Sequence, residues 1–176
     1  MQTPARLVAT AIALVTIAAA LAGCRTTYTG YESDIDGVLW RQVAMREDFF
    51  WRMVHDARSE DLLIHDTRAT VWDGASDAAD LGIADSAVII WDLEHTDHRY
   101  DFKLFISSGP RPDRPTDFGE VYRGPSEVFT CFGVTATFAD GVFPEVERDV
   151  EVTCPEELIA QMPADAAFAT DDVFDG

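Results

Sequence analysis

The alternation of apolar and polar side chains from Arg99 to Ser107 is the sequence feature that most constrains the fold. A period of two is typical of a β-strand with one face buried and the other in solvent. The apolar run 87–93 precedes this strand across a short polar connection. Together the two segments predict an antiparallel hairpin. The alternating apolar residues are Tyr100, Phe102, Leu104 and Ile106.

A second strand pair is predicted at 127–138 and 146–153. Side chains alternate between the faces of a strand, so pairing the apolar faces of these two segments puts Cys131 and Cys154 on opposite sides. A bond between the two cysteines then requires a bulge, or requires Cys154 to lie past the end of its strand. Pro155 follows Cys154 directly, which makes the second arrangement reasonable.

Helical periodicity precedes the strands. Apolar residues recur at helical spacing and predict a helix over 35–58. Ser33 and Asp36 resemble a capping box at its start. The sequence therefore predicts an α+β fold, with one N-terminal amphipathic helix packed on a mostly antiparallel β-sheet of four to six strands. The periodic residues are Leu39, Val43, Phe50, Val54 and Ala57.

The rest of the chain is expected to contain short elements. Residues 62–64 and 69–72 resemble short extended segments, although 62–67 could instead prolong the helix. Residues 75–86 are expected to form a loop that can include one helical turn. A short helix is predicted at 155–161. We place a single small domain at 35–162, followed by an acidic, partly disordered tail at 163–176.

The first 24 residues predict export. One positive charge, at Arg6, precedes an apolar run that ends at Gly23, which is typical of a secretory signal. The run closes with Leu21-Ala22-Gly23-Cys24, which resembles the lipobox of bacterial lipoproteins. The resemblance covers residues 1–24. Two alternatives are that the run stays as a membrane-spanning helix, for which it has the minimum length, and that ordinary cleavage leaves Cys24 unmodified.

The lipobox resemblance implies how the chain is processed. Residues 1–23 are then a signal peptide that is removed, and Cys24 receives a diacylglyceryl group and can be acylated further, for example with palmitate. Residues 24–34 become the lipidated cysteine and a short tether. The protein is expected in the cell envelope, anchored to a membrane on its extracytoplasmic side.

Charge limits the possible partners. The chain has 13 basic and 32 acidic residues, a formal net charge of −19. Such an excess of acid excludes nucleic acid, whose phosphates require basic partners, and opposes contact with anionic lipid. The expected partners are the membrane, through the lipid on Cys24, and an envelope protein. Composition gives no indication of the oligomeric state.

Two cysteines remain after lipidation. An even number of cysteines in an exported protein is typical of disulfide bonding. We therefore predict a disulfide between Cys131 and Cys154.

A long segment rich in proline and glycine, 108–126, separates the two predicted strand pairs. Long connections inside compact domains are often functional. This one gathers Arg111, Arg114 and Arg123 in an otherwise acidic chain. We interpret these three arginines as a candidate binding surface.

The segment 92–101 carries a second candidate site. Imidazoles and carboxylates of this kind could ligate a divalent metal. However, alternation along a strand sends neighbouring side chains to opposite faces, and this favours a solvated hairpin tip. The candidate ligands are Asp92, Glu94, His95, Asp97 and His98.

No catalytic motif accompanies these features. The chain lacks a G-x-S-x-G elbow, a phosphate-binding loop and a dinucleotide fingerprint. The sequence thus favours a non-catalytic binding or interaction module without a cofactor. The alternative is a metal-dependent hydrolase that uses the cluster at 92–101.

Overall fold

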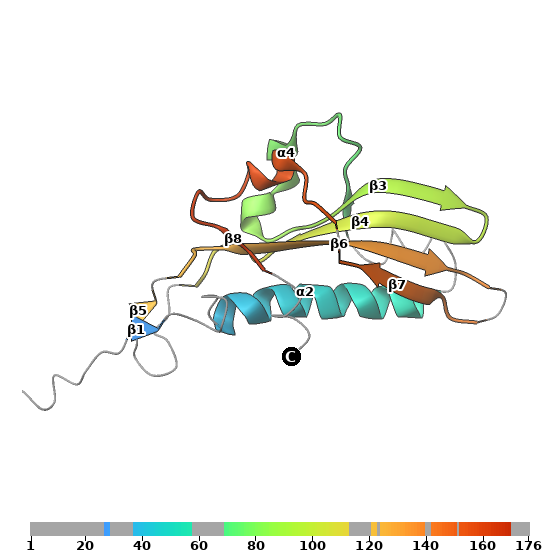
Figure 1. The fold of residues 1–176 in the computed structure, drawn as a ribbon, viewed down its shortest axis with the longest axis horizontal. Coiled ribbons are helices and arrows are strands. Elements are labelled where there is room, and N and C mark those ends of the chain that lie inside the picture. Colours follow the sequence, from blue (N-terminus) through green and yellow to red (C-terminus); the bar gives the residue numbers. More distant parts are fainter. Residues whose placement is uncertain are drawn as a thin grey trace, which may run out of the picture.

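The computed structural model describes residues 27–28, 37–57, 69–112, 121–122, 124–139, 142–150 and 152–169. It confirms the predicted α+β class, with one long helix packed on a mostly antiparallel six-stranded sheet (Figure 1). Its strands are β2 (Thr70–Val71), β3 (Val88–Thr96), β4 (Arg99–Ser107), β6 (Val128–Thr137), β7 (Glu145–Asp149) and β8 (Ala167–Phe168).

The centre of the sheet is an antiparallel meander. The order is β2-β3-β4-β6-β7, and both predicted strand pairs are present. β2 joins β3 in parallel, and β8 joins β6 in parallel. β7 and β8 pair with different parts of β6, at 133–137 and at 128–129. A separate parallel pair joins β1 (Thr27–Tyr28) to β5 (Val121–Tyr122).

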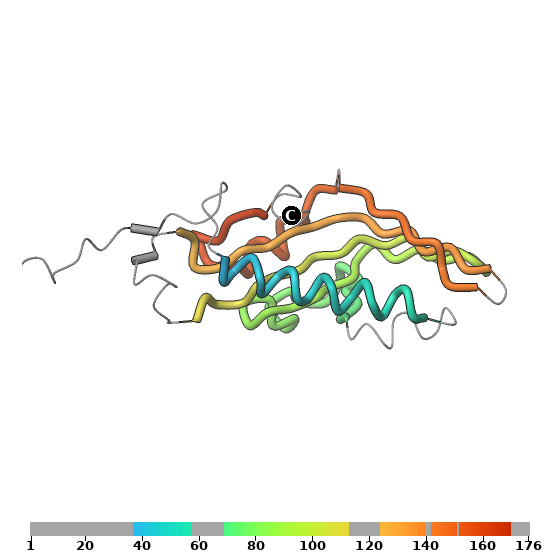
Figure 2. The backbone as a smooth tube through the Cα atoms, turned by 90° about the horizontal axis from the view of Figure 1, so that it is seen from below, coloured from blue at the N-terminus to red at the C-terminus, as the bar shows by residue number. Residues whose placement is uncertain are grey.

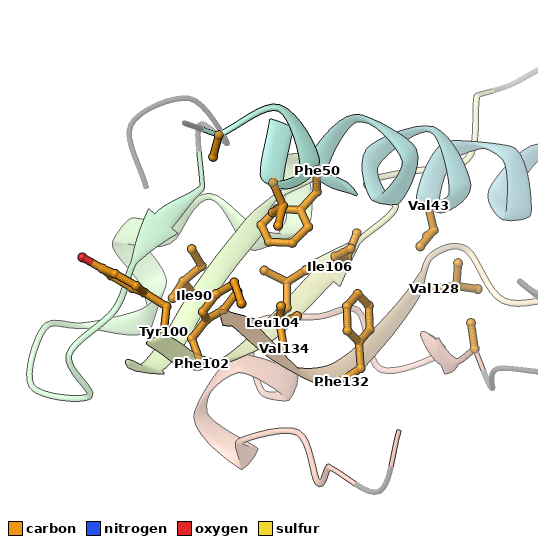
Figure 3. Close-up of a cluster of buried hydrophobic side chains, with 14 of the residues drawn as sticks. Val43, Phe50, Ile90, Tyr100, Phe102, Leu104, Ile106, Val128, Phe132 and Val134 are labelled. Atoms are coloured by element: carbon orange, nitrogen blue, oxygen red, sulfur yellow. The ribbon is translucent and has the colours of Figure 1, made fainter. Parts of the chain in front are cut away.

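The helix α2 (Gly37–Asp56) runs along one face of the sheet (Figure 2). The predicted apolar positions of the helix are fully or almost fully buried. Phe50 projects toward the sheet and meets Phe102 edge to face, with 6.0 Å between the ring centroids (Figure 3). Burying one large apolar side chain, such as that of Phe50, stabilises the fold by about 2 kcal/mol.

The opposite face of the sheet is covered over part of its area by short segments. These are the 3-10 helices η1 (Ala78–Leu81) and η2 (Ile83–Asp85), and α4 (Glu156–Ile159). Figure 1 shows them across the sheet from α2. The loop expected at 75–86 thus contains two short 3-10 helices. Apolar residues of this layer and of the sheet pack into one cluster, which includes Trp72, Ile83, Phe105, Phe129 and Leu158.

The predicted disulfide is present. Cys131 and Cys154 are joined with a Cα–Cα distance of 5.6 Å, and both are buried. β7 ends at Asp149, earlier than expected, so Cys154 lies past the strand end. Free of strand alternation, it can reach the face on which Cys131 lies.

The fold extends beyond the predicted boundary at residue 162. The first part of the predicted tail forms β8, and Ala169 is fully buried. The backbone N–H groups of Ala167 and Ala169 donate to the carbonyls of Glu127 and Phe129. This pairing uses backbone groups, so the small side chains of the segment do not prevent it. The predicted segment 62–64 lies outside the described residues.

Over the ranges that the structure describes, no helix combines the length and the apolar character needed to cross a membrane.

Candidate functional site

The predicted metal ligands at 92–98 do not form a metal site. Asp92 lies at an irregularity in β3 where the register with β4 shifts, and it has a positive φ of 52°. Its carboxylate pairs with Lys103 Nζ at 2.5 Å. The ring of His95 stacks on that of Tyr100, with 5.4 Å between the centroids.

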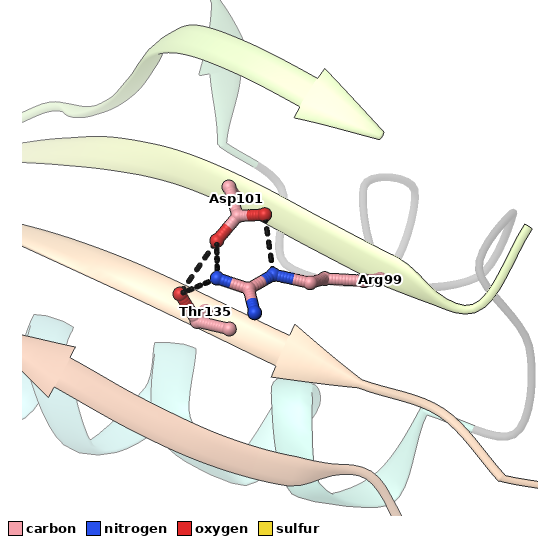
Figure 4. Close-up of polar contacts among 3 residues, drawn as sticks. All are labelled: Arg99, Asp101 and Thr135. Atoms are coloured by element: carbon pink, nitrogen blue, oxygen red, sulfur yellow. Dashed lines mark hydrogen bonds and ion pairs between the residues drawn. The ribbon is translucent and has the colours of Figure 1, made fainter. Parts of the chain in front are cut away.

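The neighbouring carboxylate of Asp101 is also occupied by protein contacts. It accepts from Arg99 Nε at 2.6 Å and from the Thr135 hydroxyl at 2.6 Å (Figure 4). These contacts, the Arg99 hydrogen bond first, lower the pKa of Asp101.

These partners explain why the predicted ligands do not converge. In the part of the chain that the structure describes, no group of three or more His, Cys, Asp or Glu side chains could hold a metal ion. The candidate ligands Asp92, Glu94, His95, Asp97 and His98 are thus not brought together, because partners and strand alternation keep the side chains apart. The structure gives the hydrolase alternative no ligand set here.

The candidate arginine surface is described only at Arg111. Its backbone N–H donates to the Ser126 carbonyl at 3.0 Å, and its Nη1 donates to the Pro112 carbonyl at 3.3 Å. Arg114 and Arg123 lie outside the described residues. Whether the three guanidinium groups form one surface thus stays a prediction.

A cavity of about 300 Å³ lies between α2 and the start of β3. Small-molecule sites have volumes from roughly 300 Å³ upward. Sequence spacing gives no signal for this cavity, because its walls come from α2, β2, η1 and the turn into β3. Its lining residues are Arg46, Phe49, Phe50, Thr70, Leu81, Ser86, Ala87 and Val88.

Two polar side chains meet in the wall of this cavity. Arg46 Nε donates to Ser86 Oγ at 3.2 Å, and Ser86 Oγ donates to the Ser107 carbonyl at 3.3 Å. Ser86 has φ +85° and ψ 103°. Side chains other than glycine rarely adopt this region, which carries a conformational cost of about 1–3 kcal/mol.

Buried contacts hold Ser86 in this conformation. The hydroxyl of the fully buried Ser107 accepts from the Ala87 N–H at 2.8 Å and donates to the Ile83 carbonyl at 2.6 Å. Gly109, with φ +69°, lies so close that a Cβ there would approach Ser86 N to 2.9 Å. The turn at Ser86 is therefore held by the Ser107 hydroxyl and by the close approach of Gly109.

A second polar feature is the carboxyl of Glu127, which is 5% exposed. Its Oε2 has no hydrogen-bond partner among the described residues. Burial, and then the charges of Asp165 and Asp85, raise the pKa of Glu127. Asp165 accepts from the Ser126 hydroxyl and N–H, which lowers the pKa of Asp165.

Comparisons of the chain with models of known protein families, with curated proteins and with solved structures found no match. The chemistry of the cavity is therefore inferred from its own geometry. The Ser86 hydroxyl lies between a guanidinium that donates and a backbone carbonyl. Neither group is a general base, so no contact among the described residues activates this hydroxyl as a nucleophile. The arrangement is suited to binding.

Proposed function

We propose that this chain is a lipid-anchored cell-envelope protein whose single domain binds a ligand or partner without catalysing a reaction. The observation that carries the proposal is that two of the three cysteines form an internal disulfide and the third follows an apolar N-terminal segment. Cys131 and Cys154 are bonded to each other inside the fold. Disulfides persist in oxidising compartments outside the cytoplasm. The third cysteine, Cys24, directly follows an apolar segment that resembles a lipoprotein signal.

Lipid and charge would act on such a protein in opposite directions. Each buried methylene of an acyl chain contributes about 0.8 kcal/mol, and two chains give stable anchoring. The net charge of −19 is repelled by anionic headgroups. The domain would therefore stay close to the membrane while its surface remains free for a partner.

The binding role is supported by the cavity beside α2. The arginines at 111, 114 and 123 remain the proposed contact surface for an envelope partner.

Lipidation is tested by expressing the full chain in a bacterial host that is fed labelled palmitate. We expect the wild-type chain to incorporate label and to partition into a detergent phase. Cys24→Ala should do neither, because it removes the thiol that carries the lipid. Thr26→Ala, a neighbouring change that keeps the thiol, should behave as wild type. Equal labelling of Cys24→Ala and wild type, or no labelling of either, would contradict the anchor.

A further inference from the structure

Arg46 differs from the other arginines of α2 in its contact with the cavity: it lines the cavity and donates to Ser86 Oγ. Arg99, Lys103 and Arg148 each pair with a carboxylate. Arg46 forms no ion pair within the described residues, although the chain has 32 acidic residues. Its single side-chain hydrogen bond there is the one to Ser86 Oγ, at the wall of the cavity.

The hydrogen bond to Ser86 orients the guanidinium. It occupies Nε and leaves the two terminal nitrogens as donors. A pair of parallel N–H groups matches the two oxygens of a carboxylate. The backbone of Ser86 is held at φ +85° by the buried contacts around it. Strained conformations that the surrounding structure maintains are concentrated at functional sites.

The remaining lining residues include apolar side chains, among them Phe49, Leu81 and Val88. A volume of about 300 Å³ holds roughly ten groups the size of a water molecule. We propose that this cavity binds a small molecule with one carboxylate and a short apolar part. The carboxylate pairs with Arg46, and the apolar part packs against the rings and aliphatic side chains.

A monoanion fits this chain better than a dianion. Among the described residues that line the cavity, Arg46 is the one cation, and the whole chain carries a net charge of −19. The overall field therefore repels phosphate more strongly than a carboxylate. This inference rests on the proposed binding role, but it is independent of the lipid anchor.

The test uses the full chain purified in detergent, with sodium benzoate as the probe. Binding is followed by saturation-transfer NMR of the benzoate protons across a concentration series. We expect saturable binding to the wild-type chain. Arg46→Gln should weaken it by about tenfold or more, because it removes a hydrogen bond to a charged group. Arg41→Gln changes another exposed arginine of α2 that does not line the cavity, and should bind benzoate as wild type does.

Two further measurements separate the roles of charge and position. Benzamide, which has the shape of benzoate without its charge, and inorganic phosphate should both fail to bind. Ser86→Gly accepts the positive φ but removes the hydroxyl, so it should keep the fold and weaken benzoate binding. Circular dichroism checks that each variant is folded.

The inference is overturned by absent benzoate binding, by equal binding to Arg46→Gln, or by comparable binding of benzamide or phosphate. Unchanged binding to Ser86→Gly would overturn the orienting role of Ser86. These results would leave the Cys24 labelling experiment untouched. Conversion of benzoate into a product would instead contradict the proposed non-catalytic role.

Discussion

The fold changes the protonation of Glu127. It is buried, and the negative charges of Asp165 and Asp85 add to the effect of burial in raising its pKa. The folded state therefore holds this proton more tightly than the unfolded state does. Below the ordinary glutamate pKa of about 4.3 both states are protonated. As pH rises through the raised pKa, the fold loses stability.

We predict that Glu127→Gln stabilises the protein at neutral pH. Glutamine has nearly the same shape and cannot ionise, so the gain should be about 1 kcal/mol at pH 7 and should vanish near pH 4. Urea unfolding of both proteins across this pH range measures the difference. Glu157→Gln, at an exposed position of α4, is the control. If the difference in unfolding free energy between wild type and Glu127→Gln does not change with pH, a raised pKa of Glu127 is contradicted.

Asp92 also shows why the candidate metal ligands at 92–98 are not brought together. The sequence brings three carboxylates and two imidazoles together at 92–98. It does not show that Asp92 lies at an irregularity of β3 and pairs with Lys103 of the next strand. Such a contact depends on the strand register, which spacing along one strand does not determine.

At the scale of elements, one partly buried ion pair joins α2 to β7. Glu47 Oε1 accepts from Arg148 Nη1 at 3.0 Å and from Trp51 Nε1 at 3.1 Å. The Arg148 guanidinium lies 4.2 Å from the centroid of the Phe132 ring. The helix is thus tied to the sheet by charge as well as by apolar packing.

Breaking this pair should destabilise the fold. We expect Glu47→Ala to lower the free energy of unfolding by about 3 kcal/mol, because it removes the Glu47 carboxylate from the partly buried Arg148 guanidinium. Asp48→Ala, at the next and exposed position, should change it by less than about 0.5 kcal/mol. Urea denaturation gives both values. Similar effects of the two variants would show that the pair is not important for stability.

The disulfide links β6 to the segment that leads into α4. Cys131 and Cys154 are 23 residues apart, and closing a loop of this size stabilises a fold by about 3 kcal/mol in the chain-entropy model. The bond thereby holds the segments that cover the second face of the sheet.

The sequence predicted those elements whose side chains repeat regularly. The helix predicted at 35–58 is α2, and the alternation from Arg99 to Ser107 coincides with β4. β8 was missed because a two-residue strand in an Ala- and Asp-rich segment has no period to detect. The positions of the two 3-10 helices were not predicted for the same reason, although a helical turn was allowed at 75–86.

At the scale of the whole molecule, the sequence did not predict that both faces of the sheet are covered. Its patterns indicated one helix on one face, whereas short segments cover part of the other face as well. The cavity beside α2 depends on this arrangement, since Arg46, Thr70 and Ser86 meet only when three distant segments pack together. A pattern along the chain cannot reveal such a site.

The central claim is that an exported domain with one internal disulfide is carried by a lipid on Cys24. The measurement that tests it most directly is the intact mass of the full chain after expression and purification from bacterial membranes. The account predicts the mass of residues 24–176 plus the lipid, less two hydrogens for the Cys131–Cys154 bond. A mass equal to all 176 residues with an unmodified Cys24 would contradict it.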